Sequence, residues 1–299
     1  MKQFLKYLYA WVADFIQTLI SCILVLFYSS PIVAKRTKNL RSKNKADNIC
    51  VVLGNGPSLK SALENGNVVQ GVYFAVNMFA QSEYFHRLQP SAYFLIDGAF
   101  FQPYDDRTED QVNNLTQIFN EVKWDMDVYV PNHADTRIFE HRITNSKIHF
   151  LKMNTIQVAG FKWVRHGIYR YNMGMPCCQT VLIAALMSAI NMGYKTIHLY
   201  GADHSWTRDL QVDENNVVCY GDRHVYNPSL TVIKMQMNIA TLLNCYSAMF
   251  KSHYLVRRYA DSVGATIYNR TEGSFIDAYT RMKSEGNIGK SDTVRFDKS

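Results

Sequence analysis

The sequence lacks the two glycine-rich motifs that most often mark nucleotide binding. It contains neither a G-x-G-x-x-G dinucleotide fingerprint nor a P-loop ending in Lys and Ser or Thr, which argues against NAD binding and against ATP hydrolysis by the P-loop route. Its six cysteines form no C-x-x-C pair and follow no regular spacing. The pattern therefore predicts neither a disulfide framework nor a zinc site, and it favours a reducing compartment. Internal repeats and low-complexity tracts are also missing.

Composition and charge limit the kind of molecule further. The chain has 299 residues, of which 47% are hydrophobic, enough for one large core or for one core and a small appendage. The net charge of +7 is local, because six of the basic residues lie within residues 35–45. A basic cluster that follows an apolar segment is typical of a membrane-flanking patch, so it favours a membrane partner over nucleic acid.

The N-terminal segment is predicted to be a membrane anchor. Residues 11–28 are largely apolar, and their length is near the minimum for spanning a bilayer. Asp14 and Gln17 interrupt the first half, so an in-plane or tilted helix is an alternative to a spanning one, and a buried core helix is another. No small-residue cleavage site is present, and the basic cluster outweighs Lys2 and Lys6. The positive-inside rule then places the rest of the chain on the cytoplasmic side of the inner membrane.

After the anchor, short apolar runs alternate with helical segments, as in a parallel α/β sheet. The predicted strands lie at 49–53, 71–76, 91–96, 128–130, 148–151, 195–200 and 265–268. The predicted helices lie at 58–64, at 176–192 and at 229–263, the last with a break near 251–253. We therefore expect an α/β fold, a single Rossmann-like domain with a mostly parallel sheet and an N-terminal membrane-associated helix. The predicted parts are an anchor at 1–34, a basic linker at 35–47, an α/β domain at 48–283 and a flexible tail at 284–299.

The most informative feature is the turn that follows the first predicted strand. It consists of Gly54, Asn55, Gly56, Pro57 and Ser58. Glycine lets the backbone turn tightly and approach a ligand, and Ser58 can cap the following helix, whose N-terminus attracts an anion. A strand, a glycine turn and a helix at the start of a domain form the usual nucleotide site of α/β proteins. The alternative is an ordinary connection between a strand and a helix.

Polar residues follow three further predicted strands. They are Asn77, Asp97 next to Gly98, and the group Gly201, Asp203 and His204. Because ligands of open parallel sheets bind at the carboxyl ends of the strands, we expect these residues to converge with the glycine turn. Amides and carboxylates there can hydrogen-bond a ribose and a base, while the turn leaves room for phosphate. Taken singly, Asn77 or Asp97 also fits a turn or capping residue, so the prediction rests on their joint placement.

These motifs resemble the bacterial family 42 sialyltransferases, and the wider group that includes motility accessory factor glycosyltransferases and hydroxymethylpterin diphosphokinase-like proteins. The likeness is carried by residues 54–59, by Asn77, and by 193–195 leading to 201–203, and it covers about residues 48–278. The resemblance implies one nucleotide-binding α/β domain with a lid over a CMP-sugar. That sugar is the donor substrate, and no further cofactor is implied.

The resemblance also implies residue roles. The nucleotide would be held by Asn55, Pro57, Ser58 and Asn77. Two positions depart from the family pattern. The residue after the third strand, often Asn in the family, is Asp97, which leaves the sugar and nucleotide preference open. The Thr-Ser-Gly at the helix start is replaced by Cys177-Cys178-Gln179-Thr180, so Gln179 and Thr180 are the nearest candidates for those polar contacts.

Transfer from a CMP-activated sugar needs a base for the acceptor hydroxyl and donors for the departing phosphate. In the family, a histidine ahead of a long helix is the base, and that position maps to His224. The phosphate-binding tyrosines of the family do not align cleanly, but Tyr220 and Tyr226 lie on the predicted lid, and Arg223 could also meet phosphate. Hydroxyls and helix N-termini can neutralise that phosphate, so we expect no metal.

Each candidate has a plainer alternative. His224 also fits a surface histidine, and Asp203 with His204 fits a strand-end cap. Residues 125–127 imitate the Asp-x-Asp metal motif of other glycosyltransferases, but they precede a strand and fit a solvated strand entrance better. Residues 177–178, both cysteines, lack an adjacent base and therefore do not predict a nucleophile.

Three functions are compatible with these residues. The leading one is a membrane-associated glycosyltransferase that moves sialic acid or a related sugar from a CMP-sugar to a cell-surface glycan of the lipopolysaccharide or capsule type. Its partners would be the nucleotide sugar, a glycan acceptor that could be lipid-linked, and the membrane. An ATP-dependent diphosphokinase of the hydroxymethylpterin type would use a magnesium-binding pair such as Asp97 and Asp203. A non-catalytic nucleotide-sugar scaffold would keep the glycine turn and tolerate loss of His224.

Overall fold

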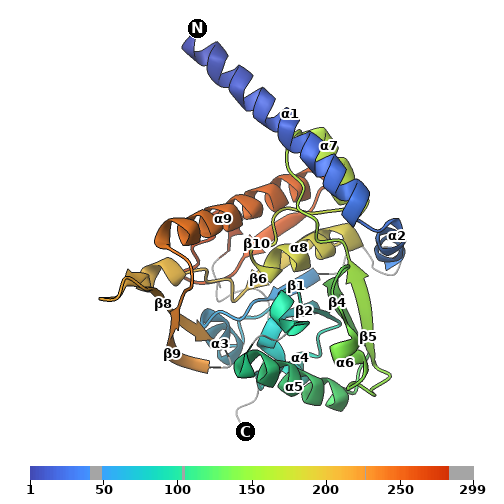
Figure 1. Ribbon diagram of the computed structural model, residues 1–299. Coiled ribbons are helices and arrows are strands. Elements are labelled where there is room, and N and C mark those ends of the chain that lie inside the picture. The colour runs from blue at the N-terminus through green and yellow to red at the C-terminus, as the bar shows by residue number, and fades with distance from the viewer. Residues whose placement is uncertain (41–48, 103–104, 226, 283–299) are drawn as a thin grey trace.

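The fold is built on one parallel sheet, seen in a computed structural model that describes residues 1–40, 49–102, 105–225 and 227–282 (Figure 1). In spatial order its eight strands are β11 (Thr280–Arg281), β10 (Thr266–Asn269), β6 (Thr196–Tyr200), β1 (Ile49–Leu53), β2 (Val72–Val76), β3 (Ala92–Phe94), β4 (Met126–Pro131) and β5 (Ile148–Met153). All neighbouring pairs of these strands are parallel. The predicted α/β class with a Rossmann-like sheet is confirmed.

The strand order contains one reversal, and it lies between β1 and β6. The chain builds the sheet from β1 outward to β5, then returns so that β6 pairs with the free side of β1. Their register sets Leu53 opposite Tyr200, so both strands end at the same level. The crevice outside the carboxyl ends of such a switch point is where open α/β sheets bind ligands. The glycine turn follows β1 and the Gly201–Asp203 segment follows β6, so both border this crevice.

Two hydrophobic clusters cover the two faces of the sheet. Cys50 and Val52 of β1 belong to the cluster around α8 (Val181–Met192) and α9 (Ile239–Ser262), whereas Val51 and Leu53 belong to the cluster on the other face. The alternation follows from the period of two in a strand. The second face is covered by α3 (Ser58–Glu64), α4 (Phe85–Leu88), α5 (Asp106–Glu121) and α6 (Arg137–Glu140), with the short 3-10 turns η2 (Asn77–Gln81) and η3 (Gly98–Phe100). A rigid sheet packed on both faces holds the loops at its carboxyl end in place.

The segment predicted as the beginning of a long helix at 229 is a strand, so that prediction is wrong. β7 (Gln211–Val212), β8 (Val218–His224) and β9 (Asn227–Lys234) form a separate antiparallel sheet, preceded by the 3-10 turn η4 (Trp206–Asp209). The β-branched run 231–233 favours a strand. Asn238 then caps α9 by accepting a hydrogen bond from the Thr241 N–H at 2.9 Å, and α9 continues to Ser262 without the predicted break.

The helix predicted from 176 begins later, at Val181. Thr180 is its N-cap, in extended conformation, and its hydroxyl accepts a hydrogen bond from the Leu182 N–H. The predicted C-terminus is correct, because Gly193 adopts the left-handed conformation at the end of α8. The shift matters for function because it turns Thr180 from a residue inside a helix into the residue at its amino end.

The N-terminal helix α1 (Lys2–Tyr28) projects from the domain, with α7 (Lys162–Arg170) beside it (Figure 1). Among the described helices, α1 alone is long and apolar enough to cross a membrane, and only 6% of its apolar window is buried. The alternative of a buried core helix is therefore wrong. α2 (Pro31–Leu40) follows and runs across the predicted boundary between anchor and linker at 34 and 35. The rest of the linker, 41–47, and the tail from 284 lie outside the described residues.

Candidate active site

The glycine turn after β1 lies against the loop after β6. The Gly54 N–H donates a hydrogen bond to the Tyr200 carbonyl and the Gly56 N–H donates one to the Gly201 carbonyl, both at 2.8 Å. A Cβ atom on Gly54 would lie 2.4 Å from the Gly201 carbonyl oxygen, and one on Gly56 would lie 1.8 Å from the Asp203 carboxylate. Glycine is therefore required at both positions, because a Cβ atom would collide with the Gly201 carbonyl at the first and with the Asp203 carboxylate at the second.

Asp203 caps helix α3 from a neighbouring loop. The Ser58 hydroxyl donates to its Oδ2 at 2.8 Å and the Ser58 N–H donates to its Oδ1 at 3.4 Å. Ser58 is itself the first helical residue after Pro57, so the prediction that its own side chain caps this helix is wrong. Burial raises the pKa of Asp203, while the two bonds from Ser58 act in the opposite direction. The Asp203 carboxylate thus occupies the helix end that the sequence suggested for a ligand anion.

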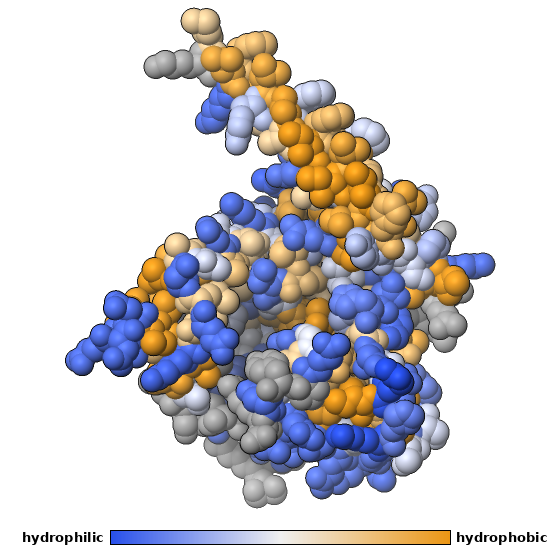
Figure 2. Space-filling model, viewed as in Figure 1, coloured by the Kyte–Doolittle hydropathy of each residue, from blue (hydrophilic) through white to orange (hydrophobic). Residues whose placement is uncertain are grey.

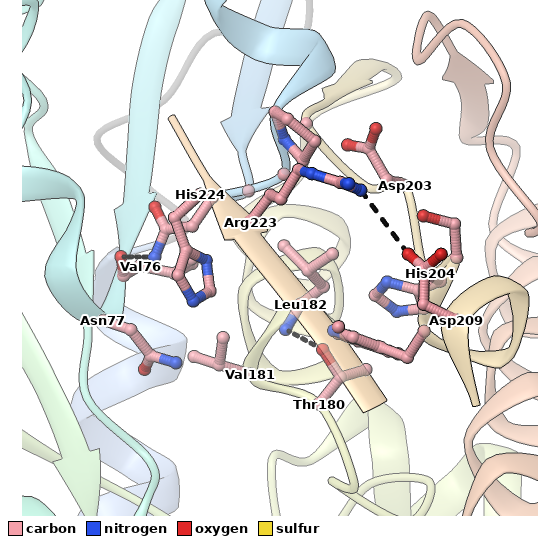
Figure 3. Close-up of a pocket in the computed structure, with 18 residues that line it drawn as sticks. Val76, Asn77, Thr180, Val181, Leu182, Asp203, His204, Asp209, Arg223 and His224 are labelled. Carbon is pink, nitrogen blue, oxygen red and sulfur yellow. Dashed lines mark hydrogen bonds and ion pairs between the residues drawn. The ribbon is translucent and has the colours of Figure 1, made fainter. Parts of the chain in front are cut away.

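A cavity of about 150 Å³ opens at the switch point (Figure 3). Eleven residues singled out in the sequence line it: Gly54, Asn55, Gly56, Pro57, Asn77, Thr180, Gly201, Asp203, His204, Arg223 and His224. They come from the ends of β1, β2 and β6, from the start of α8 and from the β8–β9 hairpin. The expected convergence of these loops is therefore observed, while the roles of the residues stay predictions.

Two buried amide oxygens on one side of this cavity have no partner in the described part of the chain. They are the Oδ1 atoms of Asn55 and Asn77. The Asn55 amide nitrogen donates to the Val76 carbonyl at 3.1 Å, and both asparagines line the cavity. Asn77 has a φ of +47°, a conformation that Asn tolerates better than most residues. An unpaired buried acceptor costs free energy, so both oxygens suit a ligand that carries N–H or O–H donors.

His224 and Arg223 reach the cavity from the end of β8. The Val225 N–H donates to the Asn55 carbonyl at 2.9 Å, which joins the hairpin to the glycine turn. Arg223 forms a half-exposed ion pair with Asp209 at 3.4 Å, at the side of the cavity away from Asn77 (Figure 3). The two residues therefore lie at the end of an antiparallel strand, with a register irregularity between Asp222 and His224, where the sequence predicted a lid loop.

A second, larger cavity of about 850 Å³ adjoins the first. The two cavities share Asn55, Asn77 and His224 in their linings. Asp97 and Tyr220 line the larger cavity only. Asp97 also caps η3 by accepting a hydrogen bond from the Ala99 N–H at 3.0 Å, which fits the capping alternative. The joint site predicted for Asp97 with Asp203 is thus divided between two neighbouring cavities.

The remaining candidates lie elsewhere. Among the described residues, Gln179 and Ser58 line neither cavity, and Tyr226 lies outside the described residues. Asp125 sits at the entrance of β4 and pairs with Lys147 at 3.2 Å, as the alternative to a metal motif predicted. Burial raises the pKa of the Cys178 thiol, which opposes a role as a nucleophile.

Sequence reasoning missed several residues around His204. The centroid of its ring lies 4.8 Å from that of the Trp206 ring, and its Nε2 lies 3.2 Å from Nε2 of His253. His253 Nδ1 in turn lies 2.8 Å from the Tyr279 hydroxyl. His253 stands in the middle of α9 and Tyr279 lies just before β11, so no local motif connects them to the site. The packing of α9 brings His253 behind His204, and the pairing of β11 with β10 brings Tyr279 behind His253.

No family model and no curated protein sequence matches this chain. Among solved structures, it is similar to the sialyltransferase CstII from Campylobacter jejuni, determined in complex with a substrate analogue, cytidine-5'-monophosphate. The identity is 13%, the match covers 85% of this chain and 96% of that one, and the TM-score is 0.43. At this level the likeness assigns neither a family nor an activity to the chain.

Proposed function

We propose that this protein is a glycosyltransferase that moves sialic acid or a related sugar from a CMP-sugar to a glycan acceptor. The observation that supports this most is the position of His224, which lines both the smaller and the larger cavity. A base for sugar transfer must stand between the donor and the acceptor, because it removes the proton from the attacking hydroxyl. In this proposal the smaller cavity binds the nucleotide and the larger one binds the acceptor.

The smaller cavity has two chemically different sides, which together fit a nucleoside monophosphate. The free oxygens of Asn55 and Asn77 can accept hydrogen bonds from a base amino group or from ribose hydroxyls. On the other side lie Arg223 and the amino end of α8 at Thr180, which both favour negative charge (Figure 3). Phosphate therefore belongs on the Arg223 side, with the nucleoside toward the asparagines.

The reaction then follows from the placement of His224. Its imidazole takes the proton of the acceptor hydroxyl, whose oxygen forms the new bond to the anomeric carbon of the sugar. The bond between that carbon and the phosphate oxygen breaks, and CMP leaves with the electron pair. General base catalysis of this kind contributes about 10²- to 10⁴-fold. Arg223 and the helix end stabilise the charge that develops on the leaving phosphate.

The diphosphokinase alternative has weaker support. It needs a carboxylate pair around magnesium, but Asp97 and Asp203 line different cavities. Each carboxylate is also engaged within the protein, Asp203 by Ser58 and Asp97 by the Ala99 N–H. A scaffold that binds nucleotide without turnover is the third possibility, and the experiment below separates it from an enzyme.

The full-length protein is incubated with CMP-sialic acid, CMP-Kdo, UDP-sugars and ATP, with and without EDTA, and nucleotide release is followed. We expect CMP release that resists EDTA and falls at least a hundredfold in His224→Ala, with CMP affinity within about threefold of the wild type. The exposed His141→Ala is the matched control and retains full release. AMP release that requires magnesium would replace the proposal by the kinase, and binding without turnover would replace it by the scaffold.

The second part of the proposal concerns the membrane. Polar residues of α1 recur at helical spacing, at Gln3, Lys6, Asp14, Gln17 and Ser21. The opposite face is broadly apolar and exposed, and it forms a continuous stripe along the helix (Figure 2). A helix with one polar stripe and a wide apolar face is typical of a segment that lies in the membrane interface.

The polar stripe of α1 is docked on the domain along its second half. The Thr18 hydroxyl accepts a hydrogen bond from the Phe161 N–H at 2.8 Å, and the Ser21 hydroxyl accepts one from the Ala159 N–H at 3.0 Å. If α1 crossed the bilayer, this irregular loop of the domain would enter the hydrocarbon core, where lipid-exposed loops do not occur. The docking therefore favours an in-plane helix over a spanning one.

We infer that α1 lies in the plane of the membrane with its apolar face among the acyl chains. Exposed Trp163 of α7, beside this helix, suits the same interface. The basic cluster that follows α1 in the sequence would meet anionic headgroups on the cytoplasmic side. A site held at the membrane surface fits a lipid-linked acceptor.

Protease protection separates the two topologies. Full-length protein with an epitope tag at each end is reconstituted into sealed vesicles of phosphatidylethanolamine and phosphatidylglycerol, and protease is added outside. For molecules whose domain faces outward, an in-plane α1 leaves both tags open to cleavage. A spanning α1 protects the N-terminal tag until detergent is added, and that result would overturn the in-plane topology. The C-terminal tag identifies the outward-facing molecules in both cases.

A further inference from the structure

A buried chain of three side chains ends at the smaller cavity. Nε2 of His204 lies 3.2 Å from Nε2 of His253, and Nδ1 of His253 lies 2.8 Å from the Tyr279 hydroxyl oxygen. All three residues are buried, with relative exposures of 6%, 0% and 4%. Only His204 lines the cavity, while His253 and Tyr279 stand behind it.

Both histidines are neutral. Burial lowers the pKa of His204 to about 3, and it lowers the pKa of His253 well below its ordinary value. Each ring therefore carries one N–H and one free lone pair. The two hydrogen bonds of the chain, between Tyr279 and His253 and between His253 and His204, must then be donated in the same direction. The question is which nitrogen of His204 holds the proton.

Counting donors fixes that direction. If the Tyr279 hydroxyl donates to Nδ1 of His253, then Nε2–H of His253 donates to Nε2 of His204, and every donor behind the cavity is used. In the reverse order the Tyr279 O–H would be buried without an acceptor among the described residues. A buried unsatisfied donor is costly, so the first order is preferred. His204 then carries its proton on Nδ1, which has no protein partner in the described part of the chain.

We propose that His253 and Tyr279 hold His204 in the tautomer that donates its Nδ1–H to the phosphate of the bound nucleotide. This inference rests on the proposed function, and it names a third phosphate contact besides Arg223 and the α8 end. His204 lies with Arg223 and Asp209 on the side of the cavity away from Asn77 (Figure 3). The Trp206 ring at 4.8 Å restricts the orientation of the imidazole.

His204 donates a hydrogen bond in this arrangement and does not give up its proton. Losing the Nδ1 proton would require replacement through His253 from Tyr279, which would leave a buried phenolate. Burial raises the pKa of Tyr279 well above its ordinary value, so this transfer is unfavourable. A fixed neutral donor at the leaving group stabilises the negative charge that develops there without reorganisation. His204 thus binds phosphate, and His253 and Tyr279 are positioning residues.

The test compares two ligands that differ only in phosphate, CMP and cytidine, on the full-length protein. Tyr279→Phe removes the donor that sets the tautomer. We expect CMP affinity to fall about two- to tenfold, because only part of the molecules then present the Nδ1–H, while cytidine affinity stays unchanged. His204→Asn keeps a donor near Nδ1 and tolerates the φ of +50° at this position, so it should retain CMP affinity within about fivefold. The matched control Tyr259→Phe removes another buried hydroxyl, bonded to Asn191 at 2.7 Å, and should leave both affinities unchanged.

The tautomer is read independently from the ¹⁵N chemical shifts of the histidine rings in the ligand-free protein. We expect His204 protonated at Nδ1 in the wild type and divided between Nδ1 and Nε2 in Tyr279→Phe, because His253 Nδ1 then lacks a partner in either order. Equal losses for CMP and cytidine, no loss for CMP, or an Nε2-protonated His204 in the wild type would each overturn the inference. If the wild type binds neither ligand, the proposed function fails, and the phosphate contact inferred for His204 fails with it. The ring shifts still report the tautomer in that case, which distinguishes this failure from that of the inference alone.

Discussion

The Val225 N–H donates a hydrogen bond of 2.9 Å to the carbonyl of Asn55, which joins the tip of the β8–β9 hairpin to the glycine turn after β1. His224 is the residue before Val225, so this bond holds its backbone next to the turn. The residue proposed as the catalytic base is thus held beside the glycine turn. A substitution in the turn is therefore expected to shift the position of His224.

Gly54→Ala should destabilise the protein and abolish nucleotide binding. The new Cβ atom would lie 2.4 Å from the Gly201 carbonyl oxygen, a backbone atom that cannot move without separating β1 and β6. We expect the free energy of unfolding to fall by about 1–3 kcal/mol or more, measured by urea denaturation. Gly167→Ala is the matched control, because a Cβ atom there meets no other atom within 4 Å and alanine favours helix α7. Equal effects of the two substitutions would contradict this account.

Asp203→Asn should change how stability depends on pH. Burial raises the pKa of Asp203 in the folded protein above the value of about 4 for an unfolded chain. Its contribution to stability is therefore full below the unfolded pKa and is lost as the pH rises through the folded pKa. Asparagine cannot ionise, so the variant should gain stability relative to the wild type between pH 4 and neutral pH, as urea denaturation would measure.

The control for this prediction is an aspartate whose pKa is shifted in the opposite direction. The hydrogen bond from Lys147 lowers the pKa of exposed Asp125. Its contribution is present above the unfolded pKa and is lost as the pH falls through the folded pKa, so Asp125→Asn should lose stability relative to the wild type as the pH rises. If the free energies of unfolding of Asp203→Asn and the wild type changed with pH in parallel, the Asp203 carboxylate would not be desolvated.

Arg223→Gln should weaken CMP binding far more than it weakens the fold. The pair with Asp209 is half-exposed, so the free energy of unfolding should change by less than about 1 kcal/mol. If Arg223 meets phosphate, CMP affinity should fall about tenfold, as isothermal titration would measure, and the loss should shrink at high salt. Arg137→Gln breaks a comparable surface pair with Asp135 outside both cavities and should spare CMP affinity.

Gly160→Ala should release α1 from the domain. Gly160 has a φ of +92°, and a Cβ atom there would lie 2.1 Å from the Thr18 hydroxyl oxygen and 2.5 Å from the Thr18 backbone nitrogen. We expect trypsin to cleave within residues 1–35 about tenfold faster in detergent micelles, with CMP affinity as in the wild type. Gly167→Ala, on the neighbouring helix α7, should leave the cleavage rate as in the wild type. An unchanged rate in Gly160→Ala would mean that the docking of α1 does not depend on this contact.

Several parts of this molecule could be predicted from the sequence because their causes are local. Apolar runs bounded by glycine predict the strand residues 51–53, the glycine turn and the Thr196–Tyr200 strand. Because the strands are parallel, their carboxyl ends then lie together. Helix α1 follows from a long apolar stretch. The long helix predicted from 229 was wrong because the strand propensity of 231–233 becomes decisive only when β8 lies alongside as a pairing partner.

The sequence by itself determined several of the residues that border the crevice, since the order of strands and turns places Gly54, Asn77 and Asp203 at strand ends. It could not determine that Asp203 caps α3 through Ser58, that His224 stands between two cavities, or that His253 and Tyr279 lie behind His204. Ser58 and Asp203, for example, are 145 positions apart in the chain. These relationships depend on side-chain packing, which no local pattern encodes, and only the tertiary structure decided them.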